Sequence, residues 1–249
     1  METNIGNYPP IDYTKWDFSG QGKNIEALLK SKDPIFWKMF EIALPTNDTR
    51  DIGHVEHVTR FAYILTELLG GNFYITLADS IFHDFAFEMT GEEWHRIVAT
   101  GKANDPSNRF KHQANAALRA DKILMEIDYT QKQRLEVYSH IVDHDTRYRC
   151  PADLNEKILR DSDILWRFTE TVRRLYHGQL SVEEFVKKLE EDELKKAGGR
   201  FYLPLAEKIA RLEIVNTSFQ ISPHEAIKTL GDLYPDETKR IMSLYYMSS

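Results

Sequence analysis

The segment SIFHDFAF, residues 80–87, places a histidine and an aspartate side by side in an otherwise apolar stretch. Residues 74–87 are apolar nearly all round, which predicts a buried central helix. A buried aspartate is costly unless it is paired, hydrogen-bonded or bound to a metal. Neighbouring helical side chains point about 100° apart, so His83 and Asp84 can share one metal only at a helix end or a bend. Two further alternatives are that Asp84 bridges two metals or forms a structural salt bridge.

Other histidines and aspartates recur before and after this segment, each in a stretch with helical periodicity. The full set is His54, His83, Asp84, His112, His140 or His144, and Asp163. A single buried histidine is more often hydrogen-bonded to a carbonyl than bound to a metal. Six histidines and aspartates in one helical core, however, favour a common site over six independent polar residues. Imidazole nitrogens and carboxylate oxygens suit Mn, Fe, Co, Ni and Zn. We therefore expect a site for one or two divalent transition metals.

Helix signals recur along the chain, whereas strand signals hardly appear. Capping boxes, in which Ser, Thr or Asp precedes Glu or Gln by three residues, begin at Thr90, Thr130, Asp153, Ser181 and Ser222. These signals predict an all-α protein. We expect an N-terminal arm over residues 1–24, a metal-binding helical domain over 25–178, and a helical extension over 179–249 packed on that domain. Residues 101–111 are predicted to be a loop, and the charge-rich stretch 181–199 a solvated helix.

Size and charge limit the classes of protein. With 249 residues, 42% of them hydrophobic, the chain can bury a sizeable core. A formal net charge of −7 argues against a nucleic-acid polymer as partner but permits a small phosphorylated ligand. The single Cys150 excludes an intramolecular disulfide and fits a reducing compartment. No signal peptide or apolar run of about 18 residues is present, so we expect a cytoplasmic protein with no membrane partner. The sequence is compatible with a homodimer.

The order H…HD…D resembles the HD-domain superfamily of metal-dependent phosphohydrolases, whose fold is a helical bundle. The stretch DIGHVEHVTRFA (51–62) resembles the first motif, and SIFHDFA (80–86) resembles the second. The stretch EKILRDSDILW (156–166) resembles the last motif, with Ser162 in place of the usual alanine. The resemblance covers roughly residues 50–170, with three motifs agreeing in order and spacing.

The resemblance also implies a ligand set. The first metal would be held by His54, His83, Asp84 and Asp163. His112 and the segment SHIVDHDT (139–146) resemble the two extra histidines of members with dinuclear sites. In those members an isoleucine precedes the second extra histidine by three residues. Ile141 has that spacing from His144, which favours His144 over His140 as the ligand, with the aspartate of the HD pair bridging the two metals.

The activity implied by the resemblance is hydrolysis of a phosphate ester or anhydride in a small nucleotide-like substrate. Asp84 is expected to orient the attacking water. An unperturbed histidine pKa of about 6.5 would suit His140 to protonate the leaving oxygen. The candidates for phosphate binding, each of which has solvated surface charge as its alternative, are Arg109, Lys111, Arg147, Arg149 and Lys157.

Two other functions stay open. Some members of the fold are di-iron oxygenases with six ligands, five of which match His54, His83, Asp84, His112 and Asp163. The second alternative is a non-catalytic module that senses a nucleotide through the site. Iron content and oxygen consumption would separate the first alternative from hydrolysis. Tight nucleotide binding without turnover would indicate the second.

Overall fold

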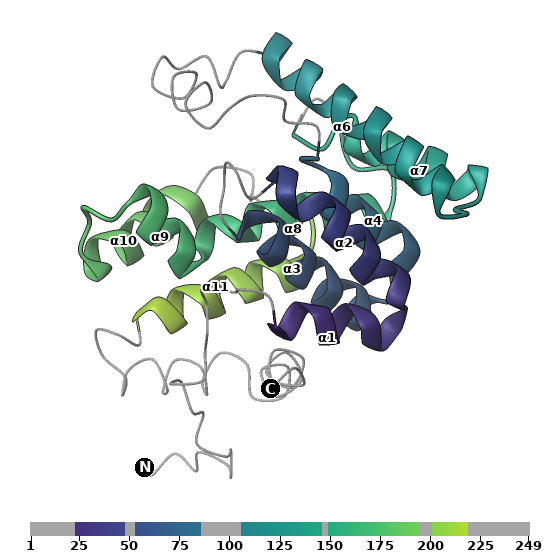
Figure 1. The fold of residues 1–249 in the computed structure, drawn as a ribbon. Coiled ribbons are helices and arrows are strands. Elements are labelled where there is room, and N and C mark those ends of the chain that lie inside the picture. The colour runs from purple at the N-terminus through teal and green to yellow at the C-terminus, as the bar shows by residue number, and fades with distance from the viewer. Residues whose placement is uncertain (1–22, 48–52, 86–105, 146–148, 195–200, 219–249) are drawn as a thin grey trace.

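The computed structural model describes residues 23–47, 53–85, 106–145, 149–194 and 201–218, and nearly all of its regular structure is α-helical (Figure 1). No strand occurs within these ranges. The α-helices are α1 Lys23–Lys32, α2 Pro34–Asn47, α3 His54–Leu69, α4 Phe73–Phe82, α6 Pro106–Glu126, α7 Gln131–Ile141, α8 Leu154–Leu165, α9 Glu170–Tyr176, α10 Val182–Lys188 and α11 Pro204–Ser218. A 3-10 turn, η3 Trp166–Phe168, follows α8, and a π-helical turn, η4 Leu189–Leu194, follows α10. The predicted all-α class is confirmed.

Local sequence signals set several of the helix ends. Thr130 and Ser181 form capping boxes with Gln133 and Glu184, as predicted. Asp153 caps α8 by accepting a hydrogen bond from the Glu156 backbone N–H. The other two predicted boxes, which begin at residues 90 and 222, lie outside the described residues. Three of the predicted helix starts are therefore confirmed.

Two local predictions were wrong. The loop predicted over residues 101–111 is helical from Pro106 onward, because proline suits the first turn of a helix and α6 begins there. The stretch predicted to be a solvated helix has a buried side, formed by Phe185 and Leu189. These two apolar residues are four positions apart, so they share one face and pack into the core.

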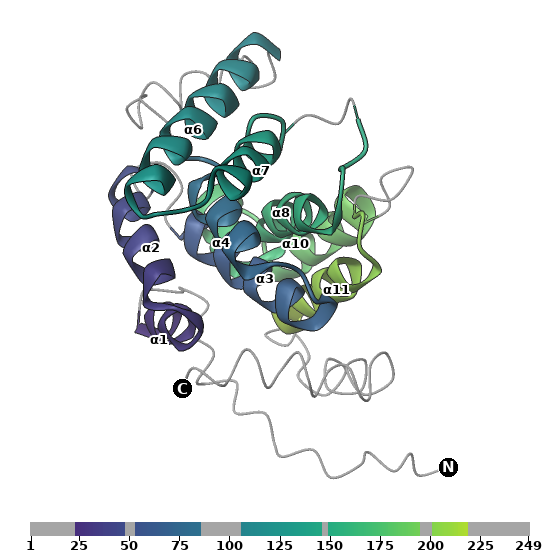
Figure 2. The same ribbon diagram turned by 90° about the vertical axis from the view of Figure 1, so that its right-hand side faces the viewer.

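Helices α3, α4 and α8 form the centre of the molecule. Helix α3 packs against α4 and α8, while α4 also packs against α2 and α7 (Figures 1 and 2). The hairpin of α6 and α7 lies on one side of this centre, and α10 and α11 lie on another. Helices on both sides therefore contact the central group, α6 and α7 through α4 and α11 through α8.

Two large apolar clusters stabilise this arrangement. One joins α1, α2, α4, α6 and α7 with part of α3, and the other joins the rest of α3 and α8 with α10 and α11. In the second cluster, Leu65 and Leu165 belong with Phe185 and Ile209, so segments on both sides of residue 178 share one core. Asp161 strengthens the connection by accepting backbone N–H groups of Tyr202 and Leu203, at 3.0 and 2.7 Å. The domain boundaries themselves stay a prediction.

No helix in the described ranges is both long enough and apolar enough to cross a membrane.

Candidate metal centre

Six side chains from five parts of the chain converge where the central helices end. His54 is the first residue of α3, and His83 and Asp84 follow α4 directly. His112 lies in α6, and His144 lies in the turn after α7. Asp163 in the last turn of α8 completes the group. The sequence predicted these six residues as metal ligands, with His144 preferred over His140. The structure brings the six side chains together, and their role as ligands stays a prediction.

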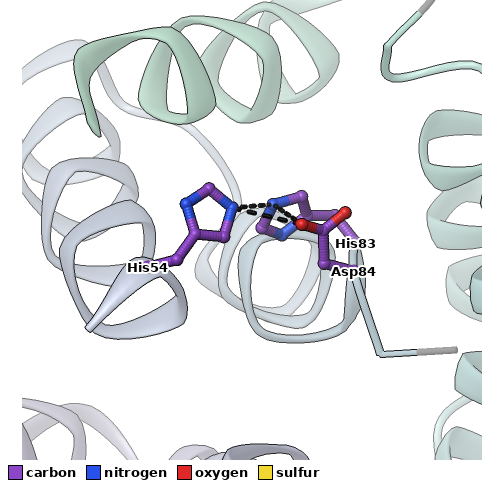
Figure 3. Close-up of side chains that lie close together, drawn as sticks. All are labelled: His54, His83 and Asp84. Atoms are coloured by element: carbon purple, nitrogen blue, oxygen red, sulfur yellow. Dashed lines mark hydrogen bonds and ion pairs between the residues drawn. The ribbon is translucent and has the colours of Figure 1, made fainter. Parts of the chain in front are cut away.

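The end of α4 allows His83 and Asp84 to serve one point although they are adjacent in the chain. The helix stops at Phe82, and Phe85 N–H donates to the Phe82 carbonyl at 3.1 Å in a tight turn. Both side chains therefore face His54 across the gap from α3 (Figure 3). Of the alternatives for adjacent ligands, the structure has the helix end.

The first group of ligand atoms surrounds His54 Nε2. This atom lies 3.0 Å from His83 Nε2, 3.3 Å from Asp84 Oδ2 and 3.4 Å from Asp163 Oδ1. His83 Nε2 is also 3.6 Å from Asp163 Oδ1. The two imidazole nitrogens and the Asp84 oxygen lie within 4.8 Å of one another, a donor set that could hold a transition metal, and Asp163 Oδ1 lies close to both nitrogens.

The second group forms on the other oxygen of the same aspartate. Asp84 Oδ1 lies 2.7 Å from His112 Nε2 and 3.6 Å from His144 Nε2. Asp84 therefore offers Oδ2 to one pair of histidines and Oδ1 to another. This division of its two oxygens fits a carboxylate that bridges two cations.

Backbone carbonyls fix the orientation of two of the histidines. His83 Nδ1 lies 2.8 Å from the Ser80 carbonyl, and His144 Nδ1 lies 2.8 Å from the Ile141 carbonyl. A carbonyl only accepts, so each Nδ1 must carry the proton and donate it. In the neutral ring, Nε2 then has its lone pair directed into the centre. Metal-binding histidines commonly use this arrangement, in which the second ring nitrogen is held by an outer hydrogen bond.

The carboxylates and histidines of the centre shift one another's pKa values in the direction that favours bound positive charge. Burial lowers the pKa of His144, but the hydrogen bond to Asp84 and the charges of Asp145 and Asp163 raise it to about 9. Burial raises the pKa of Asp163, but contact with His83 and the nearby His54 outweigh it and hold that pKa well below its usual range. Protons and metal ions compete for the same nitrogens, so a bound cation would take the place of these protons.

The six side chains of the centre differ in burial. His83 is fully buried, and the His54 ring packs edge-on against Trp166, with centroids 5.3 Å apart. Asp163 has the most exposed side chain of the group, at 21%, and the side chains of His112 and Asp84 are each 11% exposed.

His140 belongs to a separate pair. Its Nδ1 lies 2.7 Å from Asp79 Oδ2, and its Nε2 lies 3.5 Å from Asp153 Oδ2. Both members of the pair are buried. Asp79 was not predicted from the sequence, although an acid four residues before His83 in an apolar helix was the available signal. No contact among the described residues supports the predicted role of His140 as proton donor to a leaving group, and that role stays a prediction.

The predicted phosphate-binding cations have mixed placements. Arg149 pairs with Asp143 Oδ2 at 2.6 Å and with Glu156 Oε2 at 2.8 Å, so neighbouring carboxylates already occupy its guanidinium. Lys111 is exposed beside His112, and Lys157 is partly buried on α8. The side chains of the other two candidates, at positions 109 and 147, lie outside the described residues.

The buried ion pair of Glu156 and Arg160 was not predicted from the sequence. The Glu156 carboxylate accepts hydrogen bonds from Arg160 at 2.6 Å, from Arg149 at 2.8 Å and from the Ala152 N–H at 2.6 Å. Burial raises the pKa of Glu156, but these hydrogen bonds outweigh burial and lower it. The network joins the segment after His144 to α8, which carries Asp163, and so ties together two parts of the centre.

Comparisons with known proteins identify no relative of this chain. No protein-family model matches it. No curated protein and no solved structure matches it either.

Proposed function

We propose that the chain is a metal-dependent phosphohydrolase of the HD type, acting on a small, nucleotide-like phosphate ester or anhydride. The observation that carries the proposal is the position of the Asp84 carboxylate, whose two oxygens face two different pairs of histidines. A structural salt bridge would need only one cationic partner. Four histidines around one carboxylate make a donor set suited to two cations.

The donors separate into two groups. One cation would be held by His54, His83, Asp163 and Asp84 Oδ2, and the other by His112, His144 and Asp84 Oδ1. The set contains only nitrogen and oxygen donors, unlike the thiolate-rich sets typical of structural zinc. When bound, such ions supply Lewis acidity, which lowers the pKa of water from about 15.7 toward 7 and stabilises negative charge on phosphoryl oxygens.

The chain's own residues position the reaction. The Ser80 and Ile141 carbonyls hold His83 and His144 in place before substrate arrives, so little reorganisation is needed. Asp84 sits between the two groups and can accept a hydrogen bond from the attacking water. Lys111, exposed and next to His112 in the chain, is our candidate among the described cations for contact with a non-reacting phosphate. The net charge of −7 favours a small substrate over a polymer.

The test is a hydrolysis assay on the full chain, loaded separately with Mn, Fe, Co, Ni or Zn. The substrates are a generic aryl phosphate and a panel of nucleoside mono-, di- and triphosphates. We expect phosphate release with at least one metal, and its loss in Asp84→Ala but not in Asp121→Ala, a partly exposed aspartate on α6. Oxygen consumption with iron and no phosphate release would instead indicate the di-iron oxygenase. Tight nucleotide binding without turnover would indicate the sensing module.

A further inference from the structure

A second group of metal-type donors lies away from the six-residue centre. Glu136 and His140 on α7 and Asp153 at the start of α8 each bring one ligand atom within 4.8 Å of the others. None of the three belongs to the centre described above. The group joins two segments that are separated in the chain by the turn carrying His144.

The imidazole in this group has the orientation of a metal ligand. Asp79 Oδ2 accepts from His140 Nδ1 at 2.7 Å, and both side chains are almost fully buried. With its proton on Nδ1, the neutral ring directs the Nε2 lone pair toward Asp153 Oδ2, 3.5 Å away. A carboxylate that holds the far nitrogen of a histidine is the usual support of a metal-bound imidazole.

The two outer carboxylates are held in place by neighbouring groups. Asp153 Oδ1 accepts the Glu156 N–H at 3.0 Å, which leaves Oδ2 to face His140. Glu136 Oε1 accepts from Asn155 Nδ2 at 3.0 Å. Together with Asp79, three carboxylates surround one imidazole, so even a protonated ring leaves an excess of negative charge.

We propose that Glu136, His140 and Asp153 form a second divalent-metal site, of the zinc type, with Asp79 as the supporting carboxylate. One nitrogen and two carboxylate oxygens match the donors of zinc, with water as the remaining ligand. The ion fastens the C-terminal half of α7 to the start of α8. This assignment replaces the role of proton donor predicted for His140, and it does not depend on the proposed hydrolase activity.

The test uses a variant that keeps the local structure but weakens metal binding, Glu136→Gln/Asp153→Asn. Asparagine caps a helix about as well as aspartate, and the glutamine carbonyl can still accept from Asn155. The control is Glu126→Gln/Asp128→Asn, which makes the same change in charge at two exposed positions. Each full-length protein is stripped with chelator, equilibrated with Zn²⁺ alone, and analysed for zinc per chain after removal of free ion.

We expect wild type and control to bind one more zinc than the Glu136→Gln/Asp153→Asn variant. We also expect Zn²⁺ to bind to this site about 10- to 100-fold more weakly in Asp79→Asn, because the supporting carboxylate is lost. The same difference of one zinc should persist in an Asp84→Ala background, which removes the bridge of the other centre. Equal zinc content in variant and wild type in both backgrounds would overturn the proposal and leave His140 as a protonated histidine among carboxylates.

Discussion

Two ion pairs in this chain share spacing and distance but differ in burial, which allows a direct test of the network beside the metal centre. Arg160–Glu156 and Arg211–Glu207 are both i,i+4 pairs with N–O distances of 2.6 Å. The side chains of the first pair are 2% and 0% exposed, and those of the second are 44% and 48% exposed. Replacing each arginine by methionine keeps much of the apolar stem and removes the charge.

Arg160→Met should reduce the free energy of unfolding by about 3 kcal/mol. Removing one partner of a buried pair costs about 3–5 kcal/mol because the other charge stays buried. Glu156 keeps Arg149 and the Ala152 N–H as hydrogen-bond donors, which places the loss at the lower end. Arg211→Met should cost at most about 1 kcal/mol, since exposed pairs contribute little.

The assay is urea unfolding of the metal-free proteins, followed by circular dichroism. A double-mutant cycle adds Glu156→Gln, which removes the buried negative charge. The double variant Arg160→Met/Glu156→Gln should lose less stability than the sum of the two single changes. Equal losses for Arg160→Met and Arg211→Met, or strictly additive losses in the cycle, would refute the reasoning that burial makes this network strong.

Three further changes test other parts of the structure. Ser162→Ala should leave stability unchanged or raise it by up to about 1 kcal/mol, because the buried Ser162 Oγ has no hydrogen-bond partner among the described residues; a loss above about 2 kcal/mol in the same urea assay would contradict this. Gly70→Ala should cost about 1 kcal/mol and Gly70→Asn less, because Gly70 has φ +80° at the end of α3 and no atom within 4 Å of an added Cβ; equal losses for alanine and asparagine would argue against this cause. Burial lowers the pKa of His140, but Asp79 raises it to about 9, above the value in the unfolded chain. The protonated His140 therefore contributes fully to the stability of the folded protein below about pH 6.5, and this contribution is lost as pH rises toward 9. Melting temperatures of chelator-treated protein should therefore fall over that window, and His140→Gln should flatten the fall; an identical pH slope in the variant would contradict the assignment.

The sequence predicted the parts of the fold and centre that depend on local pattern. Thr130 and Ser181 predict the starts of their helices because a capping box is formed by four consecutive residues. Because helical geometry sets the directions of adjacent side chains, His83 and Asp84 could share one metal only at a helix end or a bend, and a bridge between two metals or a salt bridge stayed as alternatives. The structure has them at a helix end, with Asp84 also facing the second histidine pair.

Other features depend on contacts between distant segments. Asp79 pairs with His140 across 61 positions, and Asp161 binds N–H groups 41 and 42 positions away. Helical periodicity places an acidic residue on one face of its helix but does not identify the residue with which it pairs. For the same reason, Arg149 was predicted to bind phosphate, whereas the fold surrounds it with Asp143 and Glu156. Charge alone does not separate a free cation from one used within the fold.

The central claim is that Asp84 bridges two metal ions that support phosphoryl hydrolysis. It is tested most directly by elemental analysis of metal per chain, together with phosphate release, in wild type, Asp84→Ala and the Asp121→Ala control. We predict that Asp84→Ala loses two transition-metal ions per chain and all phosphate release, while the control keeps both. Full metal content or full hydrolysis in Asp84→Ala would contradict the claim.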